Sequence, residues 1–335
     1  MVDCSQISSL FPKCLTVFLF SFTAVNTVSN VSVFRGPGSL LLGITLSLSF
    51  YTYFKVCKVG AGSPLDFPAL RISNLKAAEQ GLELPPKFLT EKSVTLKRNG
   101  RYRFCRECMV WKPDRCHHCS GCNICILRMD HHCPWFAACV GFRNQRYFIH
   151  FLLYALTYSI IIFFWVGTDL LLWFRQEKYQ ERTINLSLLL VWILSVVVTI
   201  SMAFFTGYSV YMVTANQTTI EMYESSEQRS QVSLLDEMRG TQTQLHTNVF
   251  DLGSALRNWK AIMGQAWYEW VLPIQTFVQV RNMHSLDESG LYFEVNSDLE
   301  RQVSESMNLQ EQLMRRLTPR SSYGNGELRP IDFAV

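Results

Sequence analysis

Four long apolar stretches alternate with polar segments along this chain. They cover residues 12–34, 38–57, 147–174 and 184–213. The apolar core of a bilayer is about 30 Å thick, and a helix crosses it with about 20 apolar residues. Each stretch therefore predicts a membrane-spanning helix. The long polar segment between the second and third stretches is then a separate domain outside the membrane.

The first stretch is diluted by polar residues in its second half, which leaves a cleaved signal peptide as an alternative. The sequence Arg35-Gly36-Pro37-Gly38 instead predicts a tight turn into a second span. The third stretch has 28 residues and would be about 42 Å long as a helix. Such a helix either tilts or extends beyond the bilayer, and extension as a stem for the polar domain is the favoured prediction.

The distribution of charge predicts the orientation in the membrane. Residues 55–146 hold 16 of the 31 Lys and Arg against seven Asp and Glu, whereas the two short turns hold one and three basic residues. Positively charged loops stay in the cytosol, so the large loop and both termini are predicted to be cytosolic. The excess of nine positive charges also favours contact with anionic lipid heads. The part after residue 214 is acidic, with 10 basic and 16 acidic residues.

We find no internal repeat, and the pattern predicts a chain of consecutive segments. Residues 248–280 contain three Trp in an amphipathic run, which fits either an interfacial helix or a small packed cap. The polar end is predicted to be disordered, with one helical patch at 299–317. The predicted segments are a cytosolic N-terminus (1–11), spans 1 and 2 (12–57), a cytosolic linker (58–104), a cysteine-rich domain (105–148), spans 3 and 4 (147–213), a cytosolic C-terminal region (214–280) and the tail (281–335).

The cysteine-rich segment carries the chemistry. Residues 105–139 contain eight of the eleven cysteines and four histidines. In the reducing cytosol such density indicates metal binding rather than disulfides. The pairs Cys105/Cys108 and Cys119/Cys122 have the Cys-x2-Cys spacing of tetrahedral zinc sites, and two sites need eight ligands. Spacing alone leaves the other ligands open among Cys116, His117, His118, Cys125, His131, His132, Cys133 and Cys139.

The run Asp130-His131-His132-Cys133 also fits a nucleophilic site. A free thiol has a pKa near 8.5, so an imidazole oriented by a carboxylate is needed to remove its proton. Asp130, His131 and Cys133 supply such a set if the backbone turns His131 toward Cys133. The alternative from spacing is that Cys133 is one more zinc ligand.

The segment from Cys105 to Phe148 reads Cys-x2-Cys-x9-His-Cys-x2-Cys-x2-Cys-x4-Asp-His-His-Cys-x5-Cys-x4-Asn and ends in aromatic residues. It resembles the DHHC family of integral-membrane protein S-acyltransferases. Thr218-Thr219-Ile220-Glu221 is similar to the family's Thr-Thr-x-Glu motif. The stretch from Asn248 to Gly264, with Asn258, resembles its C-terminal palmitoyltransferase motif. We expect Thr218, Thr219, Glu221 and Asn258 to have structural roles.

This resemblance implies an α-helical integral membrane protein with four transmembrane helices. Its cytosolic cysteine-rich domain binds two structural zinc ions between spans 2 and 3. The family's pattern leaves Cys133 free as the nucleophile, with His131 as base and Asp130 orienting it. It also implies palmitoyl-CoA as acyl donor and an acyl-Cys133 intermediate. The implied zinc ligands are Cys105, Cys108, His118 and Cys125 for one ion, and Cys119, Cys122, His132 and Cys139 for the other.

Contacts to the acyl-CoA follow from the same resemblance. Lys112, Arg115 and His117 are expected at the CoA phosphates, although an ordinary solvated basic face explains them equally well. Trp135 is expected beside the acyl-CoA. Tyr158 is expected at the end of an acyl cavity, and its alternative is simple helix packing.

The sequence departs from the common family pattern at two places. Cys116 replaces a small residue and is either a spare thiol or a site of secondary acylation. Phe136-Ala137-Ala138 replaces the more usual Val-Asn-Asn and removes two amide side chains. The Phe136-Ala137 pair, together with the residues from Gly141 to Gln145, is similar to fungal vacuolar members of the family, which predicts the vacuole membrane.

The expected partners are long-chain acyl-CoA, membrane lipid and a membrane-proximal protein with an acceptor cysteine. A second hypothesis is a non-catalytic membrane-anchored zinc-binding scaffold. A nucleic-acid-binding finger is disfavoured, because the ligand spacing differs from that of zinc fingers and the spans hold the domain at a membrane.

Overall fold

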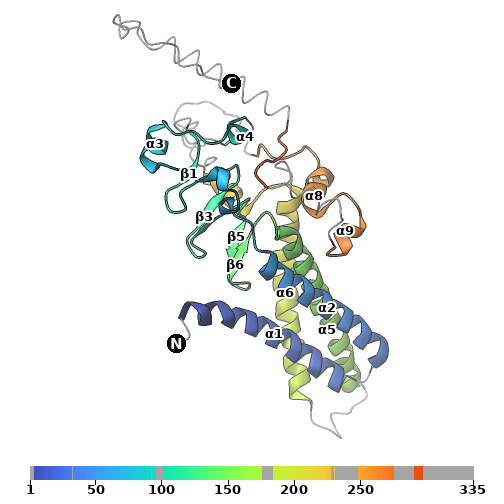
Figure 1. The fold of residues 1–335 in the computed structure, drawn as a ribbon. Coiled ribbons are helices and arrows are strands. Elements are labelled where there is room, and N and C mark those ends of the chain that lie inside the picture. The colour runs from blue at the N-terminus through green and yellow to red at the C-terminus, as the bar shows by residue number, and fades with distance from the viewer. Residues whose placement is uncertain are drawn as a thin grey trace, which may run out of the picture.

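The structure is a computed structural model of the whole chain. It describes residues 4–31, 33–91, 93–95, 101–175, 184–227, 230, 248–274 and 290–296. In Figure 1 a bundle of long helices carries a cysteine-rich domain of short strands at one end, and the described C-terminal helices lie at that same end.

Among the described residues, four helices are long and apolar enough to cross a membrane, which confirms the predicted α-helical membrane fold. They are α1 (Cys4–Asn30), α2 (Arg35–Val59), α5 (Gln145–Arg175) and α6 (Leu186–Thr214). The candidate span of α1 runs from Leu10 to Asn30. The 31 residues of α5 correspond to about 46 Å, which is longer than the bilayer core is thick.

The connection between α1 and α2 differs from the prediction. The expected turn Arg35-Gly36-Pro37-Gly38 is the first turn of α2, and the chain reverses before it, where Phe34 has a positive φ of 52°. Pro37 fits there because the first N–H groups of a helix have no partner within the helix. Gly38 is required by the close approach of α5, because a Cβ at this position would lie 2.6 Å from the Trp165 ring.

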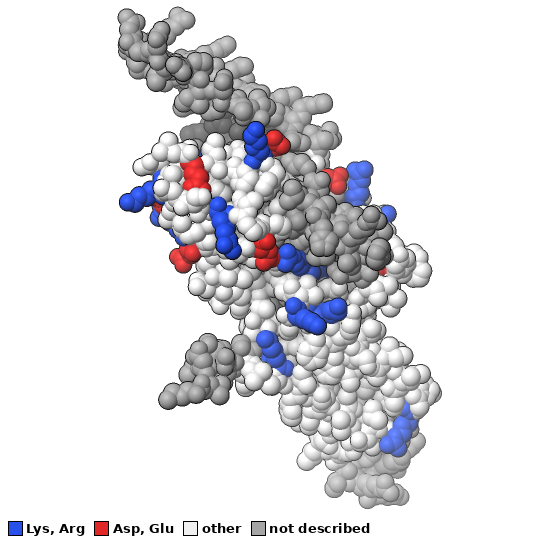
Figure 2. Space-filling model, in the orientation of Figure 1, with Lys and Arg blue, Asp and Glu red and all other residues white. Residues whose placement is uncertain are grey.

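Charge separates the two halves of the molecule. Figure 2 shows nearly all the visible Lys, Arg, Asp and Glu over the cysteine-rich end, whereas the helical bundle is almost entirely uncharged on this face. A surface of this kind fits a bundle inside a bilayer and a domain in water.

Three antiparallel hairpins form the cysteine-rich domain. The pairs are β1 (Phe104–Cys105) with β2 (Val110–Trp111), β3 (His117–Cys119) with β4 (Ile124–Ile126), and β5 (His131–Cys133) with β6 (Ala138–Val140). The hairpins repeat every 14 residues. Cys105, Cys119 and Cys133 occupy the same position in the three hairpins, each opposite the residue five positions later. Each turn also ends in a residue with positive φ, at Met109, Asn123 and Ala137. The sequence analysis was therefore wrong to find no internal repeat.

The predicted linker of residues 58–104 is partly packed. It contains η1 (Pro64–Asp66), η2 (Pro68–Leu70), α3 (Leu75–Gln80) and α4 (Lys87–Thr90). Leu70 and Leu89 from this segment pack into a cluster with Trp111 and Leu127 of the cysteine-rich domain. The linker thus supplies part of the core that the short hairpins lack.

The C-terminal region forms α8 (Ala255–Met263) and α9 (Tyr268–Val271). The packed cap, one of the two alternatives for the Trp-rich run, is present in the structure. Met263 is fully buried and Trp259 packs against the core, whereas Trp267 and Val271 are more than half exposed. One face is a packed cap, and the other is apolar and open.

The tail is not structureless throughout. Residues 290–296, within the predicted disordered tail, pack against the cysteine-rich domain, and Leu291 is 1% exposed. The predicted helical patch at 299–317 lies outside the described residues.

Asn258 joins α8 to the end of α6, and its removal tests this joint. Its side-chain amide donates to Thr214 O and Asp251 Oδ1 and accepts from the Leu252 N–H, at 2.8–3.0 Å. Asn258→Ala leaves buried partners unsatisfied, at a cost of about 1–3 kcal/mol each. We expect a lower thermal unfolding midpoint in detergent. Arg257→Ala, at an exposed neighbouring position, is the control, and equal midpoints for the two variants would contradict the assignment.

Candidate active site and metal centres

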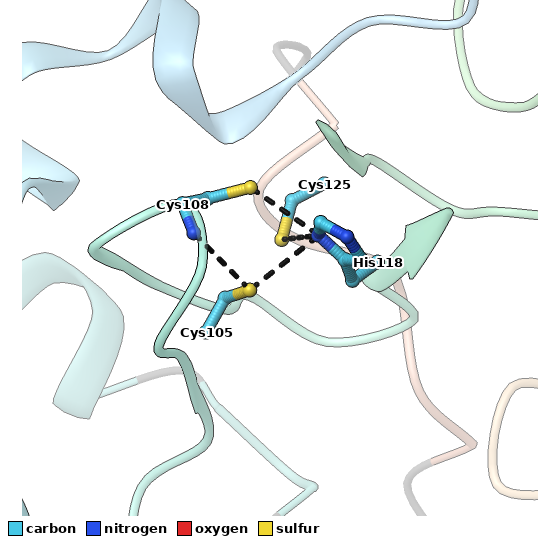
Figure 3. A group of neighbouring side chains, drawn as sticks. All are labelled: Cys105, Cys108, His118 and Cys125. Atoms are coloured by element: carbon cyan, nitrogen blue, oxygen red, sulfur yellow. Dashed lines mark hydrogen bonds between the residues drawn. The ribbon is translucent and has the colours of Figure 1, made fainter. Parts of the chain in front are cut away.

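Two groups of four Cys and His side chains could each hold a metal ion. The first consists of Cys105, Cys108, His118 and Cys125, and Figure 3 shows their sulfur atoms and the His118 Nδ1 converging on one point. The Sγ atoms of Cys105, Cys108 and Cys125 lie 3.5, 3.3 and 4.0 Å from this nitrogen. The second group consists of Cys119, Cys122, His132 and Cys139. Their corresponding distances to His132 Nδ1 are 3.5, 3.3 and 3.7 Å.

These distances fit tetrahedral zinc. With Zn–S near 2.3 Å and Zn–N near 2.0 Å, a tetrahedron separates sulfur from nitrogen by about 3.5 Å. Three thiolates and one imidazole are also a usual donor set for a closed structural zinc site. The structure thus brings together the same two sets of four that the family resemblance implied.

Strand register explains how each group assembles. His118 lies opposite Cys125 in β3–β4, and His132 lies opposite Cys139 in β5–β6. Each opposed pair meets the Cys-x2-Cys turn of the preceding hairpin. The first metal group therefore joins hairpins one and two, and the second group joins hairpins two and three.

Alternation along β5 separates metal binding from the candidate chemistry. Successive side chains of a strand point to opposite faces. His132 faces the second metal group, so His131 and Cys133 share the other face. Both of these residues, with Asp130, line a large cavity in the helical bundle. Cys133 is 5% exposed and belongs to neither metal group.

Asp130 and His131 form a charged pair beside Cys133. The His131 Nδ1–H donates to Asp130 Oδ2 at 2.9 Å. Burial lowers the pKa of His131, but hydrogen bonds to Asp130 and Cys133 outweigh it and raise this pKa to about 9. Burial likewise opposes ionisation of Asp130, yet its bond to His131 holds the carboxyl pKa below its ordinary value. The arrangement stabilises an imidazolium next to the Cys133 sulfur.

The Thr-Thr-x-Glu motif is a helix N-terminus that holds Asp130. Thr218 N–H donates to Glu221 Oε2 at 2.9 Å, and Glu221 N–H donates to Thr218 Oγ1 at 3.3 Å. This reciprocal pair is a capping box, and it starts the helical residues 219–227. The next residue, Thr219, donates its N–H to Asp130 Oδ1 at 2.8 Å and its hydroxyl to Asp130 O. The motif thereby fixes the carboxylate that holds His131.

Arg115 does not fit its predicted place at the CoA phosphates. Its side chain is 1% exposed, and its Nε lies 2.6 Å from Glu221 Oε1. Two further nitrogens donate to the side chain and carbonyl of Asn216. The guanidinium of Arg115 is therefore bound to partners inside the protein. Burial alone would raise the pKa of Glu221, but the charge of Arg115 outweighs burial and lowers this pKa.

The other predicted CoA contacts lie at or near the surface of the domain. Lys112 and His117 are half-buried, and Trp135 is 54% exposed. Burial and the nearby charges of Arg103 and Lys112 lower the pKa of His117 to about 4. His117 is thus neutral at pH 7 and carries no positive charge for a phosphate contact.

The cavity beside Cys133 has a volume of about 830 Å³ and is lined by residues of α1, α2, α5 and α6 as well as the cysteine-rich domain. This lies within the range of about 300–1,000 Å³ usual for small-molecule sites. Its walls are mostly apolar, with Phe148, Leu152 and Ile162 on α5. Tyr158 lies between Leu152 and Ile162 on α5, shares a hydrogen bond of 2.8 Å with Thr23 and donates to Phe20 O. It thereby closes the gap between α5 and α1.

Sequence reasoning missed several residues around the site. Tyr53 of α2 donates its hydroxyl to Trp135 O at 2.7 Å and so holds the turn after Cys133. Gln145 lines the cavity, and its side-chain carbonyl has no hydrogen-bond partner among the described residues. Arg128 and Asn216 are buried polar residues bonded to each other. No local sequence pattern marks these four residues. The partners of Tyr53, Arg128 and Asn216 lie far away in the chain.

The two departures from the family pattern have simple structural consequences. Cys116 is fully buried and packs with Cys105 and Cys125, so secondary acylation there does not fit this structure. Phe136 is 1% exposed, and its ring stacks on Tyr53 with centroids 4.8 Å apart. Ala137 takes a positive φ of 47° in the same turn.

Comparison with known proteins agrees with this geometry. A family model described as DHHC palmitoyltransferase matches residues 98–226. Palmitoyltransferase PFA3 of Saccharomyces cerevisiae is 47% identical over 96% of this chain and 96% of its own length. The proteins of the same name from Candida glabrata and Candida albicans are 44% and 34% identical, over 95% and 94% of this chain and 96% and 91% of their own lengths. The chain belongs to the DHHC palmitoyltransferase family, as its cysteine pattern predicted.

Proposed function

We propose that this protein transfers palmitoyl groups from palmitoyl-CoA to protein cysteines through an acyl-enzyme formed on Cys133. The observation that carries the proposal is the position of Cys133. Its thiol belongs to neither metal group, lies beside the Asp130–His131 pair and lines the apolar cavity of about 830 Å³. Exchange of one thioester for another needs an activated thiol and correct placement rather than an energy source.

In the first step the proton of the Cys133 thiol is held by His131, as the imidazolium that the site stabilises, and Cys133 reacts as a thiolate. The thiolate attacks the thioester carbonyl carbon, a new C–S bond forms, and the bond to the CoA sulfur breaks. His131 returns its proton to the departing CoA thiolate. In the second step His131 deprotonates the acceptor cysteine, whose sulfur attacks the acyl-Cys133 carbonyl and releases Cys133. Asp130 keeps the His131 ring oriented throughout.

A site at the membrane surface suits both the acyl-CoA and the protein substrate. Each CH₂ of an acyl chain costs about 0.8 kcal/mol to expose to water, so the chain is best held in the apolar cavity. The positively charged loop supports a cytosolic site with both termini in the cytosol. Substrates are then membrane-proximal proteins and acyl-CoA at a lipid surface, and not nucleic acid. The likeness of Phe136-Ala137 and Gly141–Gln145 to vacuolar members supports the vacuole membrane.

We propose zinc as the metal at both Cys/His groups and give it a structural role. Each group has four protein donors, so a bound ion would have no open position for substrate. Zinc would supply the rigidity that strands of two or three residues lack. The protein's own side chains then do the chemistry. A non-catalytic zinc scaffold is disfavoured, because it does not explain the paired Asp130 and His131 beside a free thiol on a cavity.

The acyl-enzyme is tested with Cys133→Ser. Purified wild-type protein incubated with fluorescent palmitoyl-CoA should form a hydroxylamine-sensitive adduct that maps to Cys133. Cys133→Ser should form none, and His131→Ala should form it about 10²–10⁴-fold more slowly, the usual contribution of an acid–base group. Cys57→Ser, a thiol of α2 outside the strand, is the matched control and should behave like wild type. A labelled Cys133→Ser protein, or transfer without any adduct, would exclude the mechanism.

Metal content tests the ligand assignment separately. Elemental analysis should find two zinc ions per chain in the wild type and also in Cys133→Ser. Cys125→Ala and Cys139→Ala should each bind fewer ions and unfold at lower temperature, because each removes one of four ligands. Loss of zinc from Cys133→Ser would show that Cys133 is a ligand.

Acyl-chain selection tests the role of Tyr158. Tyr158→Ala removes the ring and the bond to Thr23 that close the cavity, so the preferred acyl-CoA should become longer. Competition between acyl-CoA donors of 14 to 20 carbons measures this preference. Thr157→Ala, at the exposed neighbouring position on α5, is the control. An unchanged preference in Tyr158→Ala would favour plain helix packing.

A further inference from the structure

A short segment of the C-terminal tail, residues 290–296, is packed onto the cysteine-rich domain. Leu291 is buried in one cluster with Leu70 and Trp111, and the Tyr292 hydroxyl donates to Phe88 O. Gly290 begins the segment with a φ of 82°, and a Cβ there would lie 2.5 Å from the Phe142 ring. Only glycine fits this position, so the segment is held in a specific place.

The third side chain of this segment, Phe293, lies against two buried arginines. Its ring centroid is 5.1 Å from Arg115 Cζ and 5.7 Å from Arg128 Cζ. The Phe250 ring lies 4.4 Å from Arg115 Cζ and 6.1 Å from the Phe293 ring. Aromatic faces attract guanidinium groups at such distances, more strongly where water is excluded.

The contact matters most for Arg128, which has no carboxylate bonded directly to it among the described residues. Arg115 and Arg128 are 2% and 5% exposed. Glu221 pairs directly with Arg115, whereas Arg128 donates to Asn216 at 2.8 Å and its Nε has no hydrogen-bond partner among the described residues. Two buried like charges repel one another. The Phe293 ring is the aromatic face near both of them.

The arginines connect this ring to the candidate catalytic pair. Arg115 holds Glu221, which closes the capping box with Thr218. Thr219, the next residue, holds Asp130 by its N–H and its hydroxyl. Asp130 in turn binds His131. A contiguous chain of contacts thus runs from the tail to the proposed base, while no residue of 290–296 lines the cavity.

We propose that Phe293 is a positioning residue, through which the tail segment 290–296 fixes the Arg115/Arg128 pair and thereby the Asp130–His131 pair for acylation of Cys133. The inference rests on the proposed function of Cys133. It gives the tail a role in the rate of the chemical step and none in binding the acyl chain.

The test compares Phe293 variants in the full chain. Phe293→Ala and Phe293→Leu remove the aromatic face, and Phe293→Tyr keeps it; leucine also keeps most of the apolar volume. We measure the rate constant of Cys133 acylation at saturating palmitoyl-CoA, the half-saturating concentration and the zinc content. Phe293→Ala and Phe293→Leu should slow acylation by about 2- to 30-fold, the range of one cation–π contact. Half-saturation and zinc content should not change, and Phe293→Tyr should match wild type.

Two further variants test whether the effect comes from the placement of the segment and not from any change within it. Glu294→Ala changes an exposed side chain of the same segment and should leave the rate unchanged. Gly290→Val should push the segment off Phe142 and slow acylation as Phe293→Ala does. A wild-type rate in Phe293→Leu, or a rate loss accompanied by zinc loss in every slow variant, would overturn the positioning role. Absence of acylation in the wild type itself would instead contradict the proposed function.

Discussion

The candidate active site depends on which way three consecutive side chains of β5 point. His132 belongs to the second metal group, and the alternation of a strand then puts His131 and Cys133 on the opposite face, toward the cavity. A strand of three residues has too few contacts to keep this register alone. His132 and Cys139 lie opposite each other, so one metal ion bound to both would fix this register. Metal binding on one face would therefore keep the thiol on the other face directed at the cavity.

The 14-residue repeat explains why this thiol stays unbound. Cys133 occupies the position that Cys105 and Cys119 hold in the preceding hairpins, and those two belong to the candidate metal groups. The second cysteine of each earlier turn is replaced in the third by Phe136, which is buried against Tyr53. The next equivalents of the His and Cys ligands would be Arg146 and Leu153. Of the four donors that a third metal site would need, the repeat retains only Cys133, which is the proposed nucleophile.

Local sequence predicted most of what depends on spacing. Hydrophobic length gave the four spans, and the cysteine pattern with its family resemblance implied the two ligand sets that the structure brings together. Predictions failed where burial depends on distant partners. Arg115 looks like a solvated basic residue in sequence, but its carboxylate partner Glu221 is 106 positions away. The tail around Leu291 reads as polar, and its packing requires Leu70 and Trp111 from other segments.

The same contacts join the shape of the cavity to the chemistry beside it. Helix α6 lines the cavity and ends at Thr214, and Asn216 and Thr219 follow within five residues. Asn216 accepts from Arg115, and Thr219 holds Asp130. A shift of α6 that widens the cavity would therefore also move the carboxylate that orients His131. Because these groups are buried and hydrogen-bonded, such a shift breaks bonds rather than bending them gradually. On the proposed mechanism, a few residues after α6 would couple acyl-chain fit to thiol activation, so a poorly fitting chain is expected to slow the chemistry as well as weaken its own binding.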